Sequence, residues 1–352
     1  MSAMRVVVTG ATGNVGTSVL DALARDEAVE SIVGVARRLP DLVLPKTSWR
    51  AADVATDDLA TIFEGADCVI HLAWLIQPGR DLETLEAVNV EGSARVFAAV
   101  AAAGVGSLVH ASSVGAYSPG PKDRRVDEDW PAEGIPSAYY ARQKAEVERR
   151  LDLFELAAPD VRVVRLRPAL IFKRAAASAI RRLFVGPLLP SPLARRSLIA
   201  LVPDVDRLVF QAVHSSDVGE AYRLAATGDA RGPFNIASEP VLDPRTLADA
   251  LGARPVPFHA GALRALADVS WRLHLQPTEP GWLDMARAVP VMDTTRARRE
   301  LGWTPTRGAD EALLELIEGI RDGADFPTPP LARGTGGPLR AKELLTGVGS
   351  RP

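Results

Sequence analysis

Short apolar runs alternate with amphipathic segments through the first half of the chain. Buried-strand patterns occur at residues 5–8, 31–36, 67–72, 107–111 and 161–166. Helical spacing of apolar positions occurs at residues 15–25, 58–64, 84–103 and 137–157. Strands that alternate with helices form parallel sheets with helices on both faces. With right-handed crossovers, this pattern predicts an α/β fold with a doubly wound parallel sheet of the Rossmann type.

The pattern changes after residue 172. Residues 173–210 are rich in proline, leucine and arginine and have no clean period, which predicts irregular segments rather than a second sheet. We therefore expect a dinucleotide-binding domain at residues 1–172, with later strands from about residues 205–240. An interleaved, smaller substrate-binding cap is expected at 173–320. Prolines and glycines over residues 321–352 predict an extended or disordered tail.

Composition narrows the functional classes. A net charge of −3 gives no overall attraction to nucleic acid or anionic lipid. No apolar run approaches the ~18 residues that span a bilayer, and residues 1–8 lack a signal-peptide pattern, so we expect a soluble cytoplasmic protein. The single cysteine, Cys68, lies in an apolar strand and indicates a buried thiol. The five histidines lack ligand spacing, so no metal site is expected.

A glycine loop follows the first strand directly. Thr9 to Gly16 carries Gly10, Gly13 and Gly16 between that strand and the first helix. The first glycine permits a tight turn, the second allows a pyrophosphate to approach the backbone, and the third allows close packing of helix on strand. The helix N-terminus then offers N–H groups to phosphates. This context indicates a nicotinamide dinucleotide site.

The end of the second strand bears on the choice of cofactor. NAD sites usually place a carboxylate there, whereas a 2′-phosphate requires a cation. Here the strand ends in Arg37-Arg38, which favours NADP over NAD; an ordinary solvated strand exit is the alternative. Asp53, after a third strand, is expected either to reach the adenine amino group or to cap the following helix.

The side chains of Ser113, Tyr140 and Lys144 predict proton-transfer chemistry. Tyr140 and Lys144 are four residues apart and share one face of a helix, so the ammonium is expected to lower the pKa of the phenol. Tyr139 is the alternative phenol but points about 100° away. Ser112 and Ser113 end a strand, where hydroxyls of a parallel sheet meet the ligand. Serines at such a position also form turns or helix caps.

These motifs resemble those of the extended short-chain dehydrogenase/reductase superfamily, often labelled NAD-dependent epimerase/dehydratase, over about residues 4–320. The matching segments are Thr9–Gly16, His71-Leu72-Ala73, Asn89-Val90-Glu91-Gly92, Tyr140–Lys144, Arg167-Pro168-Ala169 and His214–Val218, with Phe172-Lys173 in place of the usual Tyr-Gly. The resemblance implies that Tyr140 is the acid/base, that Lys144 binds the nicotinamide ribose, and that Ser113 orients the carbonyl. It also implies a homodimer through helices near residues 90–103 and 140–157.

The glycine loop and the family resemblance together define an expected cofactor site. Its residues are Gly10, Thr12, Gly13, Asn14, Val15, Gly16, Arg37, Arg38, Asp53, Val54, Leu72, Ala73, Asn89, Tyr140, Lys144 and Pro168. Substrate contacts are expected from Trp74, Ser112, Val114, Arg181 and Arg182.

Three functions fit this site. The first is an NAD(P)-dependent oxidoreductase that moves hydride between nicotinamide and a carbonyl or secondary alcohol of a small molecule. The second is a nucleotide-sugar epimerase with tightly bound NAD, in which Arg181, Arg182, Arg195 and Arg196 would hold a diphosphate. The third is a non-catalytic NADP-binding sensor. A dehydratase is disfavoured because Val114 and Gly115, rather than acidic residues, follow Ser113.

Overall fold

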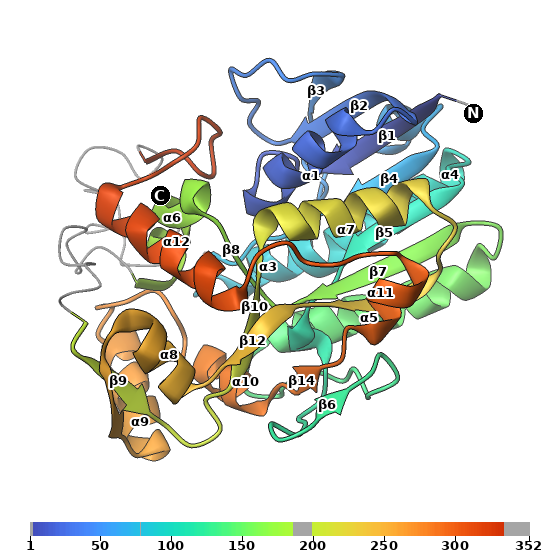
Figure 1. Cartoon of the computed structure of the whole chain (residues 1–352). Helices are drawn as coiled ribbons and strands as arrows, with labels where there is room; N and C mark the ends of the chain where they lie inside the picture. Colours follow the sequence, from blue (N-terminus) through green and yellow to red (C-terminus); the bar gives the residue numbers. More distant parts are fainter. Residues whose placement is uncertain (1–2, 78, 186–198, 334–352) are drawn as a thin grey trace.

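Seven parallel strands form the central sheet of the molecule. The computed structural model describes residues 3–77, 79–185 and 199–333. Across the sheet the order is β11 (Gly232–Ile236), β7 (Arg162–Pro168), β5 (Ser107–Ala111), β4 (Cys68–His71), β1 (Met4–Thr9), β2 (Val29–Ala36) and β3 (Thr47–Ala51) (Figure 1). The order reverses between β1 and β4, so a ligand crevice is expected beyond their carboxyl ends. The doubly wound sheet expected from the sequence is confirmed.

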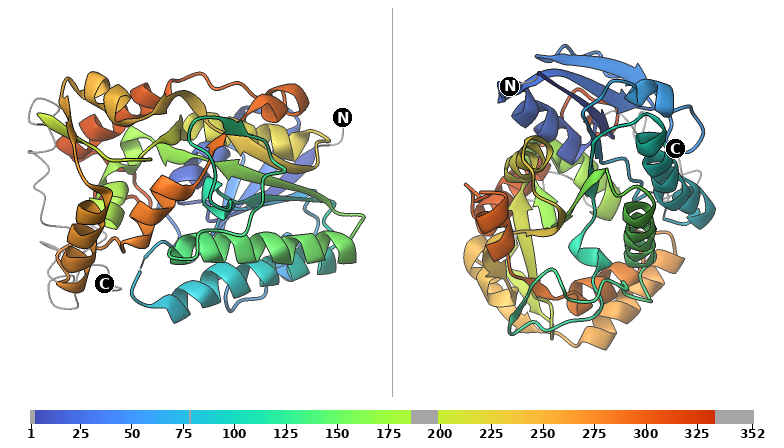
Figure 2. Two further views of the ribbon diagram at one scale, coloured as in Figure 1. Left: turned by 90° about the horizontal axis from the view of Figure 1, so that it is seen from below. Right: turned by 90° about the vertical axis from the view of Figure 1, so that its right-hand side faces the viewer.

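Helices cover both faces of this sheet. α1 (Asn14–Arg25) and α7 (Ser215–Thr227) pack together on one face. α2 (Ala60–Phe63), α4 (Gly92–Ala102) and α5 (Tyr139–Ala157) lie on the other, where α4 and α5 run side by side (Figure 2). Along β1, Val6 and Val8 belong to the first core and Val7 to the second. Burial on both faces is the reason for the continuous apolar runs.

The helix expected over residues 84–103 contains an irregular turn. α3 (Leu82–Glu86) continues into the π-helical turn η1 (Ala87–Glu91) and then into α4. A π-turn inserts one residue into the helical ladder and often marks a functional site. Asn89 lies in the middle of this turn.

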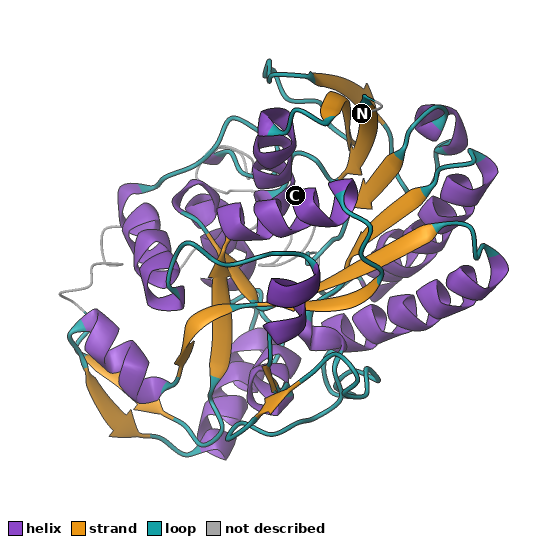
Figure 3. Ribbon diagram, turned by 45° about the vertical axis from the view of Figure 1, so that its right-hand side comes forward, coloured by secondary structure: helices purple, strands orange, loops and turns teal. Residues whose placement is uncertain are grey.

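Among the described residues, three small sheets accompany the central one (Figure 3). β8 (Leu170–Phe172), β10 (Phe210–His214) and β12 (Ser238–Leu242) form three strands, and β9 (Leu201–Asp204) pairs with β13 (Arg254–Pro257). The expectation of irregular segments without a second sheet is therefore wrong. These strands are three to five residues long and several contain proline, so their pattern is too short to recognise.

Further short elements complete the cap. β6 (Arg125–Val126) pairs with β14 (Val291–Met292). The helical elements are η3 (Arg174–Ala176), α6 (Ala177–Ile180), η4 (Arg181–Val185), α8 (Pro244–Leu251), α9 (Ala260–Arg272), α10 (Gly281–Ala288), α11 (Thr295–Glu300) and α12 (Ala309–Asp322). Within the described ranges, no helix combines the length and the apolar character needed to cross a membrane.

The start of the expected tail is packed against the body of the protein. α12 continues to Asp322, and Thr328 and Leu331 are almost completely buried. The prediction of an extended or disordered tail is wrong for residues 321–333, and residues 334–352 lie outside the described ranges. Prolines exclude regular helix and sheet here but do not prevent an irregular segment from packing.

Candidate active site

The glycine loop leaves open backbone beside a cavity. Gly10 has φ +72°, and a Cβ there would lie 2.7 Å from the Ala73 nitrogen. A Cβ on Gly16 would overlap the Gly10 carbonyl. These two glycines are therefore required by the protein's own packing. A Cβ on Gly13, which lines the cavity, would meet only the Gly10 oxygen at 3.3 Å. Its bare backbone fits the approach of a pyrophosphate.

The cavity lies at the carboxyl ends of β1, β2, β3 and β4. It is lined by Gly10, Thr12, Gly13, Val35, Ala36, Arg37, Ala52, Asp53, Val54, Leu72, Ala73, Trp74, Leu75, Val88 and Pro330. Eight of the expected cofactor residues are among them: Gly10, Thr12, Gly13, Arg37, Asp53, Val54, Leu72 and Ala73. The cavity is thus built from four strand ends that the sequence places far apart, and its glycine backbone fits the pyrophosphate of a dinucleotide.

Two charged side chains face each other at this cavity. An Arg37 guanidinium nitrogen lies 3.9 Å from an Asp53 carboxylate oxygen, and both residues line the cavity. The next residue, Arg38, is exposed and is not among the lining residues. Asp53 also accepts a hydrogen bond of 3.0 Å from the Ala55 N–H, which fixes a local turn rather than capping α2. A cation and an anion are therefore both available where a ribose would lie.

Other expected cofactor residues shape the cavity from behind. Asn89 holds the backbone of Leu75 at both polar atoms, accepting from its N–H at 2.7 Å and donating to its carbonyl at 2.8 Å. Asn14 donates to the Ile171 carbonyl, and its own carbonyl accepts from Lys173 at 2.7 Å. Asn14, Val15, Gly16, Asn89, Tyr140, Lys144 and Pro168 are not among the lining residues.

Ser113 and Tyr140 meet at the end of β5. Ser113 caps the 3-10 turn η2 (Val114–Ala116), where its hydroxyl accepts from the Gly115 N–H at 3.0 Å. Tyr140 lies in the first turn of α5 and packs on Gly115. Burial raises the pKa of Tyr140 to about 12, although a hydrogen bond with Ser113 acts in the opposite direction. The phenol is therefore protonated at neutral pH.

Lys144 is buried one turn along the same helix. Its ammonium donates to the Ala111 carbonyl at 2.7 Å and lies 3.4 Å from the centre of the Trp74 ring. Burial lowers its pKa to about 7, partly opposed by the Glu148 carboxylate. The ammonium is 5.9 Å from the centre of the Tyr140 ring. The sequence predicted a lowered Tyr140 pKa, and the direction in this arrangement is the opposite one because burial outweighs the hydrogen bond with Ser113.

Several other candidates point into the protein. The Tyr139 hydroxyl donates to the Ile76 carbonyl at 2.6 Å, and burial raises its pKa. Ser112 donates to Glu148. Arg182 donates to the Pro330 carbonyl at 2.6 Å. Arg181 is half-buried in η4, and Val114 packs beside Tyr140. Arg195 and Arg196 lie outside the described residues.

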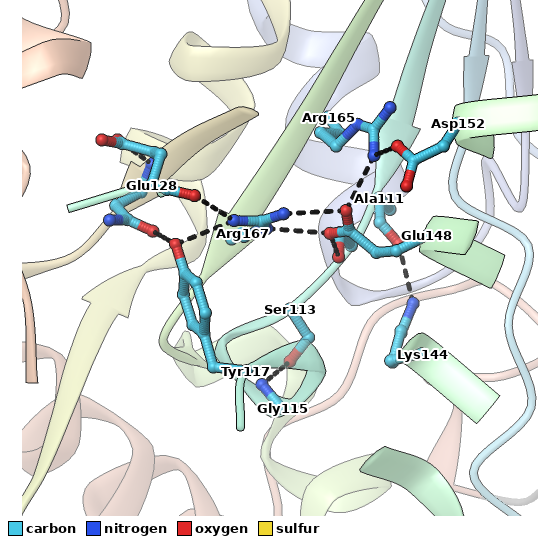
Figure 4. A network of polar contacts seen from close by, with 12 residues as sticks. Ala111, Ser113, Gly115, Tyr117, Glu128, Lys144, Glu148, Asp152, Arg165 and Arg167 are labelled. Atoms are coloured by element: carbon cyan, nitrogen blue, oxygen red, sulfur yellow. Dashed lines mark hydrogen bonds and ion pairs between the residues drawn. The ribbon is translucent and has the colours of Figure 1, made fainter. Parts of the chain in front are cut away.

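A buried ionic network supports the end of β5 (Figure 4). Glu148 accepts from Arg167 through two bonds of 2.8 and 2.9 Å and from Arg165 at 3.0 Å. Despite burial, these arginines lower the Glu148 pKa to about 2. This network was not expected from the sequence. Its signal was present, since Glu148 follows Lys144 by one helical turn and the two arginines alternate along one strand.

Aromatic side chains surround the Tyr140 phenol. The Trp282 ring centre lies 4.8 Å from that of Tyr140, and the Trp74 ring centre lies 5.9 Å away on its edge. Phe184 meets Trp282 edge-on at 5.1 Å. The cap supplies Trp282 and Phe184, neither of which the sequence singled out. The Tyr140 phenol is therefore bordered by an apolar, π-rich wall.

Comparison with known proteins identifies the family. The family model described as NAD dependent epimerase/dehydratase family matches residues 6–191, which is more than half of the chain. The chain belongs to this family. An uncharacterised Mycobacterium tuberculosis protein is 29% identical over 321 residues, covering 90% of this chain and 30% of that protein. The chain thus spans about 30% of the length of this relative.

Two epimerases are similar over nearly their whole length. UDP-glucose 4-epimerase of Mycolicibacterium smegmatis is 27% identical over 334 residues, covering 91% of this chain and 99% of the relative. The structure of the Thermus thermophilus UDP-glucose 4-epimerase with NAD has a TM-score of 0.65 at 22% identity, covering 90% of this chain and 99% of that chain. The structural likeness is one of fold.

Two further polar side chains, His71 and Cys68, are buried in the central sheet. The ring nitrogens of His71 contact the Thr9 hydroxyl at 2.7 Å and the Ser93 hydroxyl at 3.0 Å, and burial lowers its pKa to about 3. Cys68 is fully buried, and burial raises its pKa to about 11. Across the part of the chain that the structure describes, no group of His, Cys, Asp and Glu side chains could hold a metal ion.

Proposed function

We propose that the protein is an NAD(P)-dependent oxidoreductase that interconverts a carbonyl and a secondary alcohol. The supporting observation is that Ser113 and Tyr140 border the same turn at the carboxyl end of β5, the strand next to β4: Ser113 caps η2, and the Tyr140 ring packs on Gly115 within it. Hydroxyl side chains on one turn can act together on one carbonyl oxygen. Lys144, one turn further along α5, lies 3.4 Å from the ring centre of Trp74, which lines the cavity, and 5.9 Å from that of Tyr140.

Each residue has a distinct role in this proposal. Nicotinamide supplies or accepts the hydride when it is bound. Tyr140, protonated at neutral pH, gives its proton to the carbonyl oxygen as negative charge develops there. Ser113 donates a hydrogen bond to the same oxygen and holds it in place. Lys144 binds the ribose and, once there, favours the phenolate that remains.

Arg37 supports a preference for NADP. Its guanidinium lines the cavity at the end of β2, where a 2′-phosphate would lie. A planar guanidinium binds a phosphate through two hydrogen bonds, which a neutral side chain cannot replace. Asp53 lies beside it and would instead accept from a ribose hydroxyl of NAD. In this proposal NADP binds through Arg37 and NAD through Asp53, and the two side chains form an ion pair with each other.

The aromatic wall favours an apolar or aromatic substrate. Trp282, Trp74 and Phe184 present ring faces and edges rather than charges around Tyr140. Such walls bind apolar ligands with few polar contacts. A small ketone, aldehyde or secondary alcohol with a flat apolar group fits this surrounding.

Nucleotide-sugar epimerisation with tightly bound NAD is the second candidate. It is supported by the UDP-glucose 4-epimerase relative, which is similar over 99% of its length. In that reaction Tyr140 and Ser113 would act on a sugar hydroxyl instead. A cytoplasmic location and a homodimer through α4 and α5 remain predictions, the latter consistent with the exposed Leu153 and Leu156 on α5.

One experiment separates the two candidates. The purified protein is denatured, and any released nicotinamide nucleotide is identified by mass and quantified. Stoichiometric NAD would favour the epimerase, because that cycle regenerates its cofactor in place. A protein that is released empty and then binds NADPH more tightly than NADH would favour the oxidoreductase. If neither nucleotide is released or bound, both proposals are wrong.

A further inference from the structure

An irregular segment near the C-terminus forms part of the cofactor cavity. Residues 326–332, here called the strap, follow α12 and lie more than 300 residues from the glycine loop in sequence. The Pro330 side of the strap lines the same cavity as Gly10, Thr12 and Gly13. No motif in the sequence assigns a ligand-binding role to it.

Thr328 joins the strap to the glycine loop. Its hydroxyl donates to the Thr12 carbonyl at 2.9 Å, and the residue is 1% exposed. The Gly13 N–H of the same peptide unit donates to the Gly10 carbonyl at 3.1 Å. The Thr12–Gly13 peptide is thus held at both of its polar ends. Its orientation fixes the direction of the N–H groups that follow at the start of α1, which phosphates bind.

The rest of the strap is anchored to the cap. Leu331 is 2% exposed and packs with Ala176 and Ala179. Arg182 donates to the Pro330 carbonyl at 2.6 Å. The Leu331 N–H donates to the Thr328 carbonyl at 3.0 Å, which closes the strap into a turn. A segment held by packing, a side-chain bond and an internal turn is part of the cavity wall rather than a loose end.

The geometry points to the strap as a cofactor-retaining element, with Thr328 as a positioning residue for the pyrophosphate-binding loop and Pro330 as a contact for the bound nicotinamide dinucleotide. This inference rests on the proposed nicotinamide-dependent function. Release of the dinucleotide requires the loop and the wall opposite to it to separate. The Thr328–Thr12 hydrogen bond resists that separation, so its loss accelerates release.

The test measures cofactor release directly rather than turnover. Each variant is loaded with NADPH and mixed with excess NADP⁺ in a stopped-flow instrument, and the loss of NADPH fluorescence gives the dissociation rate. Thr328→Val keeps the side-chain volume and removes the donor. We expect release to become roughly fivefold faster, as for the loss of one hydrogen bond. Thr328→Ser retains the hydroxyl and is expected to release NADPH at the wild-type rate.

A matched control lies at the end of α7, outside the lining of the cavity. The Thr227 hydroxyl also donates to a backbone carbonyl, that of Arg223 at 3.0 Å, but near the end of α7. Thr227→Val should leave the release rate unchanged. Thermal melting establishes that each variant is folded. If Thr328→Val does not fold, Pro330→Ala takes its place, because it shortens a side chain of the cavity wall and keeps the Thr328 hydrogen bond. Pro330→Ala is then expected to accelerate NADPH release.

The outcomes distinguish the two proposals. A wild-type release rate in Thr328→Val would overturn the proposed role of the strap. Where Pro330→Ala replaces that variant, a wild-type rate in Pro330→Ala would do the same. Equal acceleration of release in Thr227→Val would also overturn it. In either case the proposed function would stand, because NADPH binds. A wild-type protein that binds no nicotinamide dinucleotide would overturn both.

Discussion

The Lys144 ammonium lies 3.4 Å from the centre of the indole ring of Trp74, a residue 70 positions earlier in the chain. The indole face attracts the positive charge. Burial lowers the Lys144 pKa to about 7 from an ordinary value of 10.5, and the Glu148 carboxylate partly opposes this shift. This contact links the loop after β4, which lines the cavity, to the helix that carries Tyr140.

Removal of Lys144 should change how stability depends on pH. Between pH 7 and 10.5 the unfolded chain binds a proton at Lys144 that the folded chain does not, so this lysine makes stability rise with pH over that range. In Lys144→Met this contribution is absent. In urea unfolding at several pH values, the free energy of unfolding of the wild type should rise relative to that of the variant from pH 7 to 10.5. The other buried lysines cancel in the difference, so parallel curves would contradict the assigned pKa.

Replacement of Tyr140 by phenylalanine should remove turnover and spare cofactor binding. The loss of a general acid typically costs about 10²–10⁴-fold in rate. NADPH affinity, measured by fluorescence titration, should stay close to that of the wild type because the ring remains. Tyr139→Phe is the matched control, since that hydroxyl serves the Ile76 carbonyl. If turnover survives in Tyr140→Phe and disappears in Tyr139→Phe, Tyr139 is the general acid and the assignment of Tyr140 is wrong.

Replacement of Arg37 by serine should weaken NADPH binding more than NADH binding. A lost charge-assisted contact with the 2′-phosphate predicts an NADPH dissociation constant roughly tenfold or more higher. Arg38→Ser removes the same charge from a residue outside the cavity lining, and it should alter both constants little. Calorimetric titration of both nucleotides measures the four constants. Equal losses for NADPH and NADH in Arg37→Ser would exclude a 2′-phosphate contact.

Replacement of Glu148 by glutamine should destabilise the protein strongly at neutral pH. It leaves buried Arg165 and Arg167 without their shared carboxylate, which costs roughly 3–5 kcal/mol of unfolding free energy. Glu146→Gln, on the same helix in partly exposed ion pairs, should cost no more than about 1 kcal/mol. Urea unfolding measures both, and equal small effects would show that the network contributes little.

The same variant has a defined acid dependence. The folded pKa of Glu148 is about 2, below its ordinary value of 4.5. Its stabilisation is complete above pH 4.5 and is lost as the pH falls toward 2. The gap between wild type and Glu148→Gln should therefore narrow over that range. A gap that stays constant would mean that the carboxylate is not charged in the folded protein.

The sequence by itself determined the central sheet and predicted the chemistry at its edge. Continuous apolar runs give buried parallel strands, and local spacing is enough to place Gly10, Gly13 and Gly16 in one loop and Tyr140 with Lys144 on one helix face. Carboxyl ends of parallel strands meet at one edge, so Ser113, Arg37 and Asp53 could be assigned to the same crevice. These inferences need only short-range geometry and the rules of parallel sheets.

Only the tertiary structure decided which of these side chains face the cavity and which support it. Arg37 lines the cavity and Arg38 does not, and Ser112 serves Glu148 while the adjacent Ser113 serves Tyr140. Trp282 and Pro330 come from elements with no recognisable pattern. Their places depend on long-range packing, and the direction of the Tyr140 pKa depends on burial. Neither packing nor burial at one residue is set by its neighbours along the chain.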